Sequence, residues 1–206
     1  MGALCCHPPS ELQYRDQRYR RVLWIVLGIN TVMFLAEVIA GFAAGSVSLQ
    51  ADALDFLGDS ANYGISLFVV GRALEYRAKA ALAKGLTMGC LGLWVVAAAV
   101  SNASRGTLPE AITMGVVGFV ALLANAIVFV LLWAYRSGDS NMQSVWLCSR
   151  NDVIGNVAVL LAALGVFGTG TGWPDVIVAS IMGGLALQGA WLVVRRAWGE
   201  LAEAQT

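Results

Sequence analysis

Six apolar segments, each close to 20 residues long, dominate the sequence and constrain what it can fold into. The hydrocarbon core of a bilayer is about 30 Å thick, so a helix needs about 20 apolar residues to cross it. The composition agrees, with 58% hydrophobic and 13% charged residues and a mean hydropathy of +0.71. These values are typical of a polytopic membrane protein and not of a soluble domain. We predict an all-α polytopic membrane protein with six transmembrane helices, at about 22–44, 48–71, 80–103, 108–135, 142–167 and 173–194.

The connections predict how these spans are arranged. The connections 45–47 and 168–172 are very short and rich in Gly, Ser and Thr, which indicates antiparallel hairpins of spans 1–2 and 5–6. The predicted organisation is a polar arm, a six-helix transport domain and a short tail without a soluble C-terminal domain. The arm has no signal-peptide pattern. The respective ranges are 1–21, 22–196 and 197–206.

Basic residues predict the orientation, because cytoplasmic loops carry an excess of Lys and Arg. Only Arg105 is predicted in a loop on the opposite side, and Arg150 lies within a span. The other basic residues fall in the arm, the 2–3 and 4–5 connections and the tail, which places both termini in the cytoplasm. They are Arg15, Arg18, Arg20, Arg21, Arg72, Arg77, Lys79, Lys84, Arg136, Arg195 and Arg196.

The second span carries an unusual acidic face. Asp52, Asp55, Asp59 and Asn62 fall within an arc of roughly 80° on a helix. Insertion scales put an acid near the bilayer centre at roughly 2.5–3.5 kcal/mol, so Asp55 and Asp59 together cost about 5–7 kcal/mol if ionised and unpaired. A bound cation is the leading compensation. Alternatively, Asp52 only favours the helix dipole, or a buried Asp pairs with Arg150.

The fifth span repeats this spacing in Cys148 and Asp152. Side chains four apart on a helix can bind one ion, so two such helices supply four ligands, as tetrahedral zinc prefers. We therefore predict Asp55, Asp59, Cys148 and Asp152 as metal ligands. Without a cation the carboxylates would repel one another and some would hold protons, which is the basis of metal–proton exchange. The alternative for Cys148 is a small buried hydrophobe.

Other polar residues in the spans are candidates for the transport path or for neighbours of the ligands. For Asn125 the competing interpretation is a helix–helix hydrogen bond. Glu37 is either a path residue or a buried protonated acid bonded to a neighbour. The full set is Asn30, Glu37, Asp52, Asn62, Asn125, Asn151 and Asn156.

The remaining composition is less specific. Cys5-Cys6-His7 is either part of a disordered or lipidated tail or a weak metal-collecting group. A disulfide framework is not expected, because Cys90 and Cys148 lie in apolar spans and adjacent cysteines pair poorly. The formal net charge is zero, so no affinity for nucleic acid is predicted.

Three stretches resemble the cation diffusion facilitator family of divalent-metal/proton antiporters. In its first two spans an Asn, a Glu and a Gly precede a Ser-rich turn and an Ala-Asp-Ala-x-(His or Asp)-x-x-x-Asp motif. Here these are Asn30, Glu37, Gly41 and the stretch Ala51 to Asp59. The fifth span of the family carries His-x-x-x-Asp, which Cys148 to Asp152 matches in part, and Trp173-Pro174-Asp175 is similar to the start of its sixth span.

The resemblance implies a six-helix fold, usually dimeric, with a four-ligand transport site between spans 2 and 5. By position the ligands are Asp55, Asp59, Cys148 and Asp152. Cys148 stands where the family usually has His, and Asn151, one residue before Asp152, is a candidate replacement oxygen ligand. Arg150 would oppose metal binding if it faced inward. The family's usual cytoplasmic metal-binding domain is not found after span 6 in the sequence.

We predict a secondary active transporter, not an enzyme, that exports a divalent transition metal across the cytoplasmic membrane in exchange for protons. The cargo expected first is zinc, with cobalt, cadmium, iron or manganese as other candidates. The partners are the bilayer, the ion, protons and a second copy of the chain. The alternative is a membrane metal sensor or accessory subunit that binds an ion without moving it. An intramembrane metalloenzyme is disfavoured, because the sequence has no His-Glu-x-x-His motif.

Overall fold

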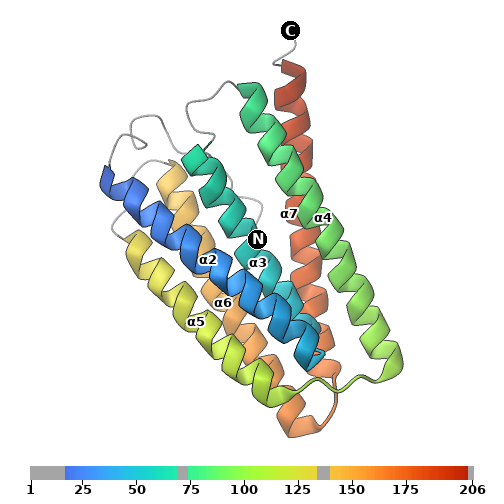
Figure 1. Ribbon diagram of the computed structural model, residues 1–206. Helices are drawn as coiled ribbons and strands as arrows, with labels where there is room; N and C mark the ends of the chain where they lie inside the picture. The colour runs from blue at the N-terminus through green and yellow to red at the C-terminus, as the bar shows by residue number, and fades with distance from the viewer. Residues whose placement is uncertain (1–16, 69–73, 134–139, 204–206) are drawn as a thin grey trace.

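The computed structural model describes residues 17–68, 74–133 and 140–203, with side chains left undescribed at 19, 66, 74, 77, 140–150 and 203. The described residues form six long helices that run antiparallel to one another along the chain (Figure 1). The predicted all-α fold class is therefore confirmed. The helices are α2 (Gln17–Ala44), α3 (Val47–Phe68), α4 (Leu74–Arg105), α5 (Ala111–Trp133), α6 (Ser140–Thr169) and α7 (Trp173–Glu203).

The predicted spans all overlap these helices, but several boundaries differ. Helix α4 begins six residues before the predicted residue 80, and α7 continues to Glu203, so most of the predicted tail is helical. Helix α2 begins within the predicted arm, at Gln17. Helix propensity extends past the apolar window, because Arg, Lys, Glu and Ala are good helix formers in water as well as in lipid.

The helices pack as a bundle in which α4 and α7 lie along each other and α3 lies at the centre, touching α2, α4, α6 and α7 (Figure 1). Small residues permit the close approach of α4 and α7. A Cβ added at Gly85 would lie 2.8 Å from Cγ2 of Val194, and one added at Gly92 would lie 3.2 Å from Cδ2 of Leu187. Packing through small residues is a general source of helix association in membranes.

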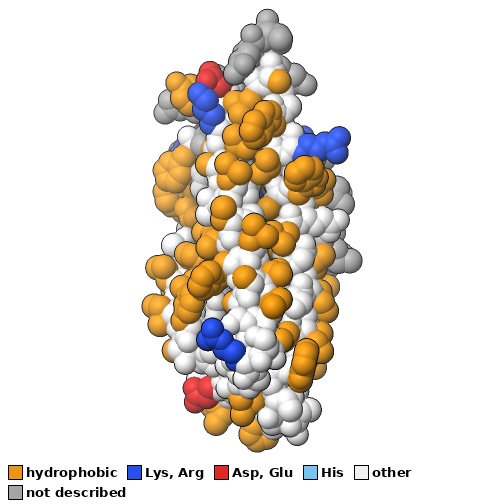
Figure 2. Space-filling view, turned by 90° about the vertical axis from the view of Figure 1, so that its right-hand side faces the viewer, with side chains coloured by type: hydrophobic (Ala, Val, Ile, Leu, Met, Phe, Trp, Pro, Cys, Tyr) orange, Lys and Arg blue, Asp and Glu red, His pale blue; other side chains and the backbone are white. Residues whose placement is uncertain are grey.

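The outer surface suits a bilayer. Five of the described helices are long and apolar enough to cross a membrane; α3, which carries Asp52, Asp55 and Asp59, is not one of them. Figure 2 shows hydrophobic side chains over the middle of one face, with charged side chains toward its two ends. The apolar face thus lies outward and the acidic helix is shielded inside.

The two ends of the bundle differ. Helices α2 and α4 begin and α7 ends at one end, which we call the basic end because it carries Arg18, Arg20, Lys79 and Arg195 (Figure 1). The turns between α2 and α3, α4 and α5, and α6 and α7 lie at the opposite end. The positive-inside rule would place the basic end, and with it both termini, in the cytoplasm. That orientation stays a prediction.

Candidate metal centre

Helix α3 carries the acidic face and begins at a tight turn. Gly45 has φ +67°, a conformation that favours glycine, and Ser46 follows it. The Ser46 Oγ accepts a 3.2 Å hydrogen bond from the Leu49 N–H, as an N-cap residue does. This start fixes the rotation of α3, because every later side chain follows at 100° per residue.

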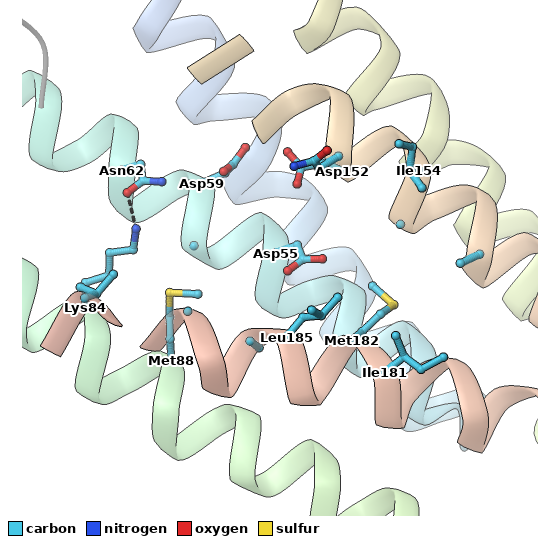
Figure 3. A pocket seen from close by; sticks show the side chains of 17 residues that line it. Asp55, Asp59, Asn62, Lys84, Met88, Asp152, Ile154, Ile181, Met182 and Leu185 are labelled. Carbon is cyan, nitrogen blue, oxygen red and sulfur yellow. Dashed lines mark hydrogen bonds between the residues drawn. The ribbon is translucent and has the colours of Figure 1, made fainter. Parts of the chain in front are cut away.

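A cavity of about 250 Å³ lies between α3, α6, α4 and α7, and three aspartates line it (Figure 3). Asp55 and Asp59 come from α3 and Asp152 from α6. Apolar side chains of α7, among them Met182 and Leu185, form the facing wall. Asn62, Asn151, Lys84 and Met88 also line the cavity, so the predicted neighbours Asn62 and Asn151 lie beside the acids.

Asp59 and Asp152 connect the two motifs. Their carboxyl groups face each other across the α3–α6 boundary and interact directly (Figure 3). The Tyr63 hydroxyl donates a 3.3 Å hydrogen bond to Oδ2 of Asp59, while Oδ2 of Asp152 is buried with no hydrogen-bond partner among the described residues. An orphaned carboxylate oxygen inside a protein is costly, and a cation or a proton would satisfy it.

Within the described part of the chain, no three His, Cys, Asp or Glu side chains are close enough together to hold one ion. The three aspartates share a cavity, but a zinc ion with bonds of about 2.0–2.2 Å to oxygen would have to draw them closer. The side chains of Cys148 and Arg150 lie outside the described residues, as does the Cys5-Cys6-His7 arm. The predicted four-ligand set therefore stays a prediction.

A second polar layer lies behind the cavity. Asn156 Nδ2 donates a 2.6 Å hydrogen bond to Oδ2 of Asp52, and Asn125 Nδ2 donates a 2.8 Å hydrogen bond to Oδ1 of Asn156. The helix–helix hydrogen bond considered for Asn125 is thus present. Asp52 does not line the cavity. It lies beyond the first turn of α3, so interaction with the helix dipole does not explain its position.

Glu37 and Asn30 are buried on α2, away from the cavity lining. Asn30 Nδ2 donates to the Val26 carbonyl at 2.8 Å, while its Oδ1 has no hydrogen-bond partner in the part of the chain described. Both carboxyl oxygens of Glu37 also have no hydrogen-bond partner among the described residues. The nearby carboxyl group is that of Asp52. The structure therefore leaves both interpretations of Glu37 open.

Lys84 was not predicted as a site residue, because the sequence placed it among the basic residues of the connection between spans 2 and 3. That placement is wrong, because Lys84 lies ten residues inside α4, is only 9% exposed and lines the cavity. The signal was available, since Lys84 falls within the predicted third span and a lysine in a span faces the protein interior.

Comparison with known proteins identifies the relatives of this arrangement. The chain matches the cation efflux transmembrane domain over residues 23–202. It is 27% identical over 210 residues to the zinc transporter ZitB of Escherichia coli (strain K12), which covers 96% of this chain and 66% of that protein. It is 24% identical over 195 residues to the metal cation efflux system protein CzcD of Cupriavidus metallidurans, which covers 89% of the chain and 62% of that protein.

A third relative is the "cadmium, cobalt and zinc/H(+)-K(+) antiporter" of Bacillus subtilis, 25% identical over 193 residues, or 85% of this chain and 61% of that protein. The chain therefore spans just under two thirds of the length of these curated relatives. The resemblance seen in the motifs is confirmed, because the family match runs from Leu23 in α2 to Ala202 in α7. The chain belongs to the cation efflux, or cation diffusion facilitator, family and is a multi-pass integral membrane protein.

Proposed function

We propose that the chain moves a divalent transition-metal cation, zinc first among them, out of the cytoplasm in exchange for protons. The observation that carries the proposal is the meeting of Asp59 from α3 with Asp152 from α6 in one cavity, with Asp55 beside them. The printed names of the relatives support the cargo, since they refer to zinc, cadmium and cobalt, and one of them names an antiporter with H(+) and K(+).

In this proposal Asp55, Asp59 and Asp152 hold the ion, and Cys148 is the fourth ligand. Cys148 precedes Asp152 by four residues in the sequence of α6, which is the spacing at which two helix residues can bind one ion. Asn151 and Asn62 supply neighbouring amide oxygens at the cavity wall. Thiolate together with carboxylate favours zinc or cadmium, while oxygen-rich sites also accept cobalt, iron or manganese.

The exchange follows from the buried acids. Carboxylates bind metal only when deprotonated, so arrival of the ion displaces protons and arrival of protons releases the ion. The apolar wall formed by Met182 and Leu185 keeps the local dielectric low, which strengthens both interactions relative to water. No separate cofactor is required, because the metal is the cargo.

The test is zinc flux into proteoliposomes under an imposed pH gradient, read with an entrapped zinc-sensitive dye. We expect flux in the wild type, and at least tenfold less in Asp59→Asn and in Asp152→Asn. Glu110→Gln is the matched control, because Glu110 is an exposed acid at the opposite end of the bundle and should leave flux unchanged. Stoichiometric zinc binding without any flux would instead support the sensor or accessory subunit.

We further propose a homodimer in the cytoplasmic membrane, formed through the transmembrane helices, with both termini in the cytoplasm. The charge asymmetry between the basic end and the opposite end supports the orientation. Accessibility of a cysteine introduced at the exposed Thr171, in the turn at the opposite end, tests it against the wild type. Labelling from outside intact cells is the expected result.

A further inference from the structure

The cavity contains one cation of the protein's own. Among the described residues that line it, the ionisable side chains are Asp55, Asp59, Asp152 and Lys84. A lysine inside a membrane span is unfavourable unless it has a partner or a function, so the position of Lys84 beside three aspartates calls for a physical reason.

Lys84 is held in place from the opposite wall. Its Nζ donates a hydrogen bond to Oδ1 of Asn62, on the same face of α3 as Asp59, three residues away (Figure 3). The ammonium charge acts on the Asp59 carboxyl group. The side chain thus reaches from α4 across the cavity to the helix that carries two of the acids.

Lys84 reduces the negative charge that the cavity offers to a divalent ion. Three ionised aspartates and one lysine sum to two negative charges, and a Cys148 thiolate in the proposed ligand set would raise the sum to three. Without Lys84 either sum would be one unit more negative, so a divalent cation would be attracted more strongly at low dielectric. The same lysine repels the incoming ion, because two like charges in one cavity interact strongly at low dielectric.

We propose that Lys84 is an affinity-determining residue, a tethered cation that competes with the divalent ion for the aspartates and promotes its release. The inference rests on the proposed function. It predicts that removal of the lysine charge produces a transporter that holds its ion more tightly and turns over more slowly. Removal of a purely structural contact would instead weaken binding.

The experiment measures zinc binding by titration calorimetry and zinc flux in proteoliposomes for the full chain. For Lys84→Met we expect a zinc Kd at least about tenfold lower than in the wild type, together with a lower KM and a lower kcat, because like charges within one cavity repel strongly. Lys84→Arg keeps the charge and should stay within about threefold of the wild-type Kd. Lys84→Gln, neutral but still able to bond Asn62, should behave like Lys84→Met and replaces it if that variant does not fold.

Lys79→Met is the matched control. Lys79 lies on the same helix as Lys84 but is exposed and paired with Glu75. The zinc affinity and flux of the Lys79→Met protein should therefore equal those of the wild type. Asp59→Asn separates the two proposals. If Asp59→Asn abolishes zinc binding while Lys84→Met and Lys84→Gln bind zinc no more tightly than the wild type, this inference is wrong and the proposed function stands. If the wild type itself binds no zinc, both are wrong.

Discussion

The side-chain amide of Asn156 donates a 2.6 Å hydrogen bond to Oδ2 of Asp52, which joins α6 to α3 where both side chains are buried. Asn125 of α5 extends the contact by donating to Asn156. Three helices are thus tied together by one amide that acts as donor and acceptor. This polar layer lies behind Asp55 and Asp59 and fixes the rotation of α3, on which the direction of both acids depends.

Substitution of Asn156 should therefore destabilise the bundle and impair transport together. Asn156→Leu leaves Asp52 and Asn125 without their partner, and hydrogen bonds between membrane helices average about 0.6 kcal/mol with a maximum near 1.7 kcal/mol. We expect a loss of about 1–3 kcal/mol in the free energy of unfolding, measured by denaturant titration in detergent, because two buried groups lose their bonds. Ser104→Ala, at an exposed site, should change neither stability nor flux. An Asn156→Leu protein as stable as wild type would contradict this role.

Asp175 should stabilise the start of α3 from a distant point in the sequence. Its carboxylate accepts hydrogen bonds from Ser46 Oγ at 2.7 Å, Val47 N at 2.9 Å and Ser48 N at 3.0 Å. An acid at a helix N-terminus is favoured both by the free N–H groups and by the helix dipole. Asp175→Ala should lower the free energy of unfolding by about 1–2 kcal/mol, the range for loss of a helix cap.

The conservative variant separates charge from hydrogen bonding at this cap. Asp175→Asn keeps one acceptor oxygen, so its loss in thermal stability should be smaller than that of Asp175→Ala. Thr171→Ala, which alters an exposed residue of the same turn, should have no measurable effect. Equal melting temperatures for Asp175→Ala and wild type would show that α3 does not need this cap.

Gly172 should tolerate no side chain. A Cβ at this position would lie 2.1 Å from the backbone oxygen of Thr107, in the connection between α4 and α5. The backbone cannot yield as a flexible side chain would, so Gly172→Ala should cost about 1–3 kcal/mol through strain. Gly168→Ala is the matched control, because nothing lies within 4 Å of its Cβ, and it should be neutral or slightly stabilising. Melting temperatures of the two variants, measured by intrinsic fluorescence, give the comparison.

Cys148 should control which metal is preferred. If it is a ligand, Cys148→Ser should weaken cadmium binding more than cobalt binding, because thiolate favours soft ions and a hydroxyl does not. Cys148→His should restore zinc affinity, since imidazole is a good zinc ligand. Cys90→Ser is the control, as Cys90 is exposed on α4 and should not affect binding. Identical metal preference in wild type and Cys148→Ser would assign Cys148 to packing alone.

The six helices and their membrane location could be predicted from the amino-acid sequence alone. Span length and hydropathy are sums over local residues, so the apolar segments could be found without knowledge of their neighbours. The sequence also identified Asp55, Asp59 and Asp152 as a candidate site, because an acid in a membrane span is too costly to face lipid. The family motifs agreed with that assignment, which stays a prediction, and the domain match confirmed the family.

Which of these polar side chains contact one another depends on how the helices pack. The cavity between α3, α4, α6 and α7 brings Lys84 beside the acids, while Asp52 is turned toward Asn156 and Glu37 instead. Both outcomes depend on how neighbouring helices rotate and how closely small residues such as Gly85 let them approach. Those quantities are set by contacts between residues far apart in the chain, which local hydropathy and spacing do not encode.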